Sequence, residues 1–94
     1  MTFSPASLSD RHGRRWYLHR RRLDLREVGR MLRRSDVPVV LAAAGLTQSV
    51  APDERDALWQ RVKTAYGRAR HLDYLGREYL GTDGTPLLVI EQRA

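Results

Sequence analysis

Residues 15–34 read RWYLHRRRLDLREVGRMLRR, a stretch in which a strand pattern passes directly into a helix pattern. The first seven of these residues, 15–21, are rich in aromatic side chains and loosely alternate in polarity, which is typical of a strand. The alternation directs Trp16 and Leu18 toward the core and Tyr17 toward the other side.

The helix expected after this strand begins with a full start signal. Asp24 is the predicted N-cap, and Glu27, three residues later, supplies the second half of a capping box. Apolar residues then recur at helical spacing until about Arg34, so one face of the helix is apolar. These apolar residues are Leu25, Val28, Met31 and Leu32.

The middle of the chain contains one ambiguous segment and one clear helix. Residues 39–44, VVLAAA, begin as a buried strand, although the three alanines suit a helix equally well. Residues 52–66 begin with proline and two acidic residues, which is a typical first turn of a helix. Gly67 is the predicted C′ residue at which this helix stops.

The last third of the chain has the pattern of a β-hairpin. Residues 71–80 and 86–92 are apolar-rich and flank the turn sequence TDGT at residues 82–85. The expected register places Leu80 opposite Leu87. The predicted fold is therefore α+β, a single small two-layer sandwich in the order β-α-β-α-β-β. It occupies residues 14–94, after a flexible lead-in at residues 1–13.

A second interpretation applies to residues 25–44, LREVGRMLRRSDVPVVLAAA. They resemble the helix-turn-helix of repressor and excisionase-type DNA-binding domains, with Val28-Gly29 as the apolar and small pair. The resemblance implies a helix-turn-helix or winged-helix DNA-binding protein. However, Arg33-Arg34 replaces the usual turn residues, and Pro38 lies inside the supposed recognition helix.

Composition excludes several classes of protein. The 94 residues include no cysteine, which excludes a disulfide framework and a cysteine nucleophile. The longest apolar run is about half the length of a membrane span. The first ten residues lack the pattern of a signal peptide, so we expect a cytoplasmic protein that does not contact membranes.

The positive charge is concentrated in one quarter of the chain. The formal net charge is +6, yet residues 11–34 alone contain ten arginines and only two acidic residues. Arginine suits phosphate recognition, because its planar fork donates two hydrogen bonds to one anion. Lys63 is the one lysine, and a GC-rich coding bias is the alternative explanation for the arginine excess. That bias does not explain the clustering.

The chain contains no recognisable catalytic motif. It has no G-x-S-x-G elbow and no glycine-rich phosphate loop, and we predict no cofactor, no metal site and no catalytic residue. One enzymatic alternative is a metal-independent ribonuclease that uses His19, His71, Tyr17 and Arg21 on a shared sheet face.

We therefore expect a small, basic, non-enzymatic domain that binds DNA or RNA through its first strand and first helix. The alternative is an interaction module that binds an acidic protein partner. Apolar residues on both faces of the last strand indicate either an internal strand or a homodimer. The predicted nucleic-acid-binding residues are Tyr17, Arg20, Arg21, Arg22, Arg26, Arg30, Arg33 and Arg34.

Overall fold

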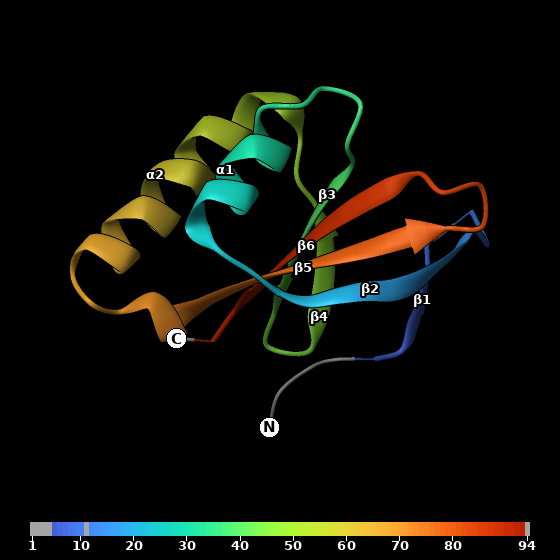
Figure 1. The fold of residues 1–94 in the computed structure, drawn as a ribbon, viewed down its shortest axis with the longest axis horizontal. Helices are drawn as coiled ribbons and strands as arrows, with labels where there is room; N and C mark the ends of the chain where they lie inside the picture. Colours follow the sequence, from blue (N-terminus) through green and yellow to red (C-terminus); the bar gives the residue numbers. More distant parts are fainter. Residues whose placement is uncertain (1–4, 11, 94) are drawn as a thin grey trace.

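The computed structural model describes residues 5–10 and 12–93. Two helices lie against a six-stranded, curled sheet, so the predicted α+β class is confirmed (Figure 1). The strands are β1 (Ser7–Ser9), β2 (Arg15–Leu23), β3 (Val39–Ala43), β4 (Leu46–Ser49), β5 (Tyr74–Gly81) and β6 (Pro86–Gln92). The helices are α1 (Leu25–Leu32) and α2 (Arg55–Gly67), and short 3₁₀ turns form η1 (Pro52–Glu54) and η2 (His71–Asp73).

The sheet has the strand order β1-β2-β5-β6-β3-β4. β3 runs parallel to β6, and all other neighbouring strands are antiparallel. β2 and β3 therefore point the same way but are separated by β5 and β6. The chain crosses this gap through α1, which contacts both β2 and β6.

The structure adds two edge strands to the predicted order. β1 lies within the residues expected to form the lead-in, and its sequence, Ser-Leu-Ser, has too few apolar residues to indicate a strand. All four residues of β4 are exposed, so it also lacks an apolar pattern. β4 follows β3 through Ala44 and Gly45, whose φ angles are +52° and +79°. Two positive φ angles are typical of the mirror-image turn that joins hairpin strands.

The ambiguous middle segment is a strand. Val39–Ala43 forms β3, which pairs with β4 on one side and β6 on the other. The helix-turn-helix interpretation is therefore wrong, because the segment proposed as its second helix lies in the sheet.

The predicted hairpin forms, but its register differs by one residue. Leu80 lies opposite Pro86 rather than Leu87. In the turn, the N–H of Gly84 donates to the carbonyl of Gly81 at 3.0 Å, and Gly84 has a φ of +83°. This is the three-residue loop with glycine in the left-handed region. Since the loop is one residue shorter than expected, every pair along the hairpin shifts by one.

The start of α1 is confirmed in part. The Asp24 carboxylate accepts the N–H of Glu27 at 2.8 Å, as an N-cap does. The Glu27 side chain, expected to return a hydrogen bond to Asp24, instead pairs with Arg20 of β2. α1 thereby gains a polar connection to the sheet. The helix ends at Leu32, two residues before the predicted end.

The end of α2 differs from prediction. Gly67 is the last helical residue, and the left-handed C′ position is taken by Ala69, with a φ of +58°. The N–H of Ala69 donates to the carbonyl of Tyr66, and that of Arg70 donates to the carbonyl of Ala65. These two bonds define a Schellman motif. An alanine therefore occupies the position that glycine usually takes.

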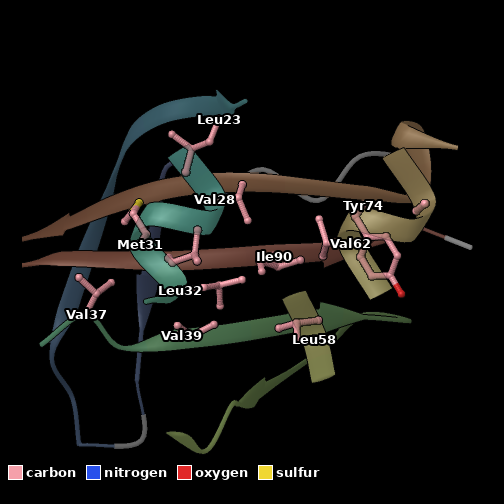
Figure 2. Close-up of a cluster of buried hydrophobic side chains, with 12 residues drawn as sticks. Leu23, Val28, Met31, Leu32, Val37, Val39, Leu58, Val62, Tyr74 and Ile90 are labelled. Atoms are coloured by element: carbon pink, nitrogen blue, oxygen red, sulfur yellow. The ribbon is translucent and has the colours of Figure 1, made fainter. Parts of the chain in front are cut away.

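The main core lies between the helices and one face of the sheet (Figure 2). α1 contributes Val28 and Leu32, and α2 contributes Leu58 and Val62, all at most 4% exposed. Gly76 of β5 lets α1 approach closely, because a Cβ at this position would lie 2.5 Å from a Val28 methyl carbon. The buried members of this cluster are Leu23, Val28, Met31, Leu32, Val37, Val39, Leu58, Val62, Ala65, Tyr74, Leu88 and Ile90.

A second buried cluster lies on the opposite face of the sheet. Its members are Trp16, Ala42, Tyr79, Leu87 and Val89. β6 contributes to both clusters and lies between β5 and β3, so it is an internal strand. The apolar residues that raised the alternative of a homodimer are therefore buried within one chain.

Candidate nucleic-acid interface

Three arginines extend from the side of α1 that faces solvent. Because Val28, Met31 and Leu32 turn toward the core, helical spacing directs the arginines the other way. All three are exposed, and none forms an ion pair with a carboxylate in residues 5–10 and 12–93. They are Arg26, Arg30 and Arg33.

α2 adds a fourth cation beside this row. Gly29 of α1 packs against the half-buried Trp59 of α2, and a Cβ at Gly29 would lie 2.7 Å from the indole. The Arg33 guanidinium carbon is 5.8 Å from the Trp59 ring centroid, and Lys63 Nζ is 5.5 Å from it. Cations at this distance from an indole ring are attracted to its face. Arg26, Arg30, Arg33 and Lys63 together are called the α1 basic surface below.

The sequence analysis missed the contributions of Trp59 and Lys63. Trp59 lies at the edge of the core and packs against Gly29 of α1. One signal was available, since Trp59 and Lys63 are four residues apart and share a helix face. What the sequence did not show is which face of α2 lies beside α1.

Arg20 is held by two carboxylates. Its Nε donates to Glu78 of β5 at 2.8 Å, and its Nη1 donates to Glu27 of α1. The hydrogen bond that Arg20 donates to Glu78 is the main reason that the pKa of Arg20 is raised. Arg20 therefore joins β2, β5 and α1, and a phosphate would have to displace a carboxylate to bind it.

Arg34 is also paired, although at an exposed site. Its Nε and Nη2 donate to the two oxygens of Asp36 at 3.1 Å and 2.7 Å. The hydrogen bonds with Arg34 are the main reason that the pKa of Asp36 is lowered. Exposed pairs of this kind exchange readily with solvent ions, so Arg34 is less restrained than Arg20.

The other predicted residues lie along β2. Arg21 and Arg22 are exposed near its end, where the register with β5 is irregular. Tyr17 is 45% exposed and lies opposite Leu80, beside the β5–β6 turn at the far end of the sheet from the helices (Figure 1). The structure therefore gathers Arg26, Arg30 and Arg33 on one surface and leaves Tyr17 apart from them.

The histidines proposed for a ribonuclease lie in β2 and in η2, on separate parts of the fold. His19 lies in β2, with Nε2 3.9 Å from a Glu78 carboxylate oxygen. His71 lies in η2, before β5 begins, and its ring centroid is 6.1 Å from that of Tyr66. From Tyr74 to Glu78, β5 extends about 13 Å. The sheet register thus does not bring the two histidines together.

Metal-ligand groups and membrane-spanning helices were also sought among the described residues. These residues contain no group of three or more His, Cys, Asp or Glu side chains arranged to hold a metal ion. Within the same part of the chain, neither helix has the length and apolar character needed to cross a bilayer.

Comparison of the chain with models of known protein families, with curated proteins and with solved structures finds no match. Function is therefore inferred from the residues and geometry of this chain.

Proposed function

We propose that this chain is a small, non-enzymatic domain that binds the phosphate backbone of nucleic acid through β2 and α1. The α1 basic surface is the observation that supports this proposal. Its four cations lie on α1 and on the adjoining face of α2, and none is neutralised by a carboxylate in the described part of the chain. Unpaired cations gathered on one surface favour a polyanionic partner.

The spacing of the α1 arginines suits consecutive phosphates. Arg26 and Arg33 are seven residues apart, which is about 10 Å along a helix. Phosphates of one DNA strand advance about 3.4 Å each along the duplex axis, so α1 is long enough to follow about three of them. Each guanidinium donates two hydrogen bonds to one phosphate, a geometry that ammonium groups lack.

β2 extends the proposed contact. Arg21 and Arg22 are exposed and add positive charge next to α1, and Tyr17 offers an exposed ring for stacking at the far end of the strand. Arg20 and Arg34 are expected to contribute less to affinity, because a phosphate must first replace their carboxylate partners. The expected contribution of each of the eight predicted residues therefore depends on the contacts that it already makes.

The test is a binding titration with labelled duplex DNA, single-stranded DNA and RNA at several salt concentrations. Wild-type protein is expected to bind with a steep salt dependence, because each phosphate contact releases a counterion. Replacing two contacts in Arg26→Gln/Arg30→Gln is expected to reduce the slope of log affinity against log salt by about two. It should also weaken binding at low salt.

The matched control is Arg61→Gln/Arg68→Gln. Arg61 and Arg68 are also exposed and lack an ion pair among the described residues, but helical spacing places them on the side of α2 away from Trp59. This variant has the same net charge as Arg26→Gln/Arg30→Gln and is expected to bind nearly as wild type does. Equal losses in both variants would show that net charge, and not the α1 basic surface, governs binding.

Two other outcomes would replace the proposal. Capture of one acidic protein by the same surface, without any nucleic-acid binding, would favour the interaction module. RNA cleavage that is lost in His19→Ala or His71→Ala would favour the ribonuclease.

A further inference from the structure

A pocket of about 430 Å³ opens where β2 passes into α1. Its walls come from five segments: the end of β2, the start of α1, the C-terminal part of α2, η2 with the start of β5, and the residue after β6. This volume is within the range of small-molecule sites in proteins. Its lining residues include Arg22, Asp24, Leu25, Tyr66, His71 and Leu72.

One part of the pocket wall is aromatic and aliphatic. The rings of Tyr66 and His71 lie 6.1 Å apart, at an interplanar angle of 54°. Leu25 is half-buried, and Leu72, in η2, is 59% exposed. A single exposed leucine is common on protein surfaces, but this one lines the same pocket as the two aromatic rings. Such a wall suits a flat, largely apolar ring.

The polar groups of the pocket are unequal in availability. Asp24 already caps α1, Glu27 pairs with Arg20, and Arg93 pairs with Glu91. Arg22 forms no ion pair in the described part of the chain, so it is the cation free to meet an anion. Burial raises the pKa of Tyr66, and its phenol, which is neutral near pH 7 even at the ordinary tyrosine value, can donate a hydrogen bond.

The pocket and the α1 basic surface both include residues of the first turn of α1. Leu25 lines the pocket, and the next residue, Arg26, is the first arginine of that surface. A strand whose phosphates follow α1 would reach this turn, where the pocket opens. Arg22, on the rim, is placed to hold a phosphate beside it.

We propose that this pocket receives an unpaired base from a single-stranded nucleic acid whose phosphates lie along α1. This inference rests on the proposed function and adds a preference for single strands. Bases in a duplex are stacked and paired, so they cannot enter a pocket without being extruded. An unpaired base can turn outward and place its flat face against the apolar wall.

The test compares a short oligothymidylate with a hairpin duplex by fluorescence anisotropy, using wild type, His71→Ala/Leu72→Ala and Leu46→Ala. Leu46 is also an exposed leucine, at 74%, but it lies in β4 outside the pocket. The double variant is expected to bind oligothymidylate about tenfold more weakly, the effect of losing one stacked base. Its affinity for duplex should be unchanged, and Leu46→Ala should behave as wild type.

A second measurement uses wild-type protein alone. Titration with thymidine monophosphate is expected to shift the amide NMR signals of His71 and Leu72 and to leave that of Leu46 unchanged. Absence of these shifts overturns the pocket proposal, and so does an unchanged oligothymidylate affinity in a folded double variant. In either case, salt-dependent duplex binding would leave the proposed function standing. Absence of binding to every nucleic acid would overturn both.

Discussion

The two faces of the sheet are both buried, but by different means. On one face, α1 and α2 supply apolar side chains, and no buried charged residue of the described part of the chain lies among them. On the other face, the cluster is smaller, and Arg77 and Glu91 lie buried beside it at 2% and 6% exposure. There the segment at Pro5 lies against the sheet, since the Tyr79 hydroxyl donates to the carbonyl of Pro5 at 2.9 Å. The stability of the first face depends on how well its apolar side chains fit together. The stability of the second face also depends on the pairing of its buried polar groups.

The largest expected effect is on the second face. Glu91→Gln removes the charge that compensates Arg77, and leaving one member of a buried pair unpaired costs about 3–5 kcal/mol. The measurement is the free energy of unfolding in urea. Asp36→Asn, which breaks the exposed pair with Arg34, is expected to cause no measurable change.

A double variant, Arg77→Met/Glu91→Leu, sharpens this prediction. Arg77 Nε is buried and has no hydrogen-bond partner among the described residues, so the pair is incompletely satisfied. Replacing both members by apolar residues is therefore expected to restore most of the stability. A double variant as unstable as Glu91→Gln would contradict the idea that the lost charge is the cause.

On the first face, Gly76→Ala tests the dependence on shape. Its Cβ would lie 2.5 Å from a Val28 methyl carbon, and overpacking of this kind costs about 1–3 kcal/mol. Combining it with Val28→Ala should give a smaller loss than the sum of the two single losses. Gly67→Ala is the control, because a Cβ there meets nothing within 4 Å. Additive losses would show that the contact is not the cause.

The two faces should also differ in how their contribution to stability changes at acidic pH. Burial opposes ionisation of Glu91, but hydrogen bonds and charge from Arg77 and Arg93 outweigh it and lower the pKa of Glu91. Because the pKa is lower in the folded state, this contribution to stability is complete above the ordinary Glu value of about 4.3. It is lost as the pH falls through the folded-state pKa. Glu91→Gln should therefore flatten the acid side of the stability curve, measured by urea unfolding at several pH values.

The smallest expected effect concerns the contact with Pro5. Tyr79→Phe removes one partly buried hydrogen bond and is expected to cost about 1 kcal/mol in the free energy of unfolding. Tyr17→Phe, at an exposed ring, is the control and should change stability much less. Equal effects would mean that the Tyr79 hydroxyl does not help to secure the second face.

Sequence reasoning worked where local chemistry determines structure. The Asp24 cap, the apolar face of α1 and the Asp83-Gly84 turn each depend on residues within a few positions, and all three are present. It failed where the outcome depends on neighbours distant in sequence. β1 and β4 exist because they pair with β2 and β3, and their own residues give little sign of it.

Two turns differ from their predicted positions by one or two residues. One residue in the β5–β6 loop changed the register of the whole hairpin. At the end of α2, the glycine at position 67 suggested a stop that the chain makes two residues later, at Ala69. Both errors arise because several loop geometries fit the same turn residues.

In the candidate site, too, some features follow from local sequence and others depend on how distant elements pack. The outward direction of Arg26, Arg30 and Arg33 follows from the helical period and was predictable. The pairing of Arg20 with Glu78 and the position of Lys63 beside Arg33 were not, because they depend on how separate elements pack.

The place of β6 in the sheet determines when the chain can fold as it is synthesised. β6 is the last of the six strands to leave the ribosome, yet it lies between β5 and β3 and belongs to both buried clusters. Until it emerges, the pair β3–β4 has no link to β1, β2 and β5, and neither apolar cluster is complete. Most of the pairing therefore has to form late and in one cooperative step, so a nascent chain that stalls before residue 86 presents two separate strand edges to chaperones and proteases.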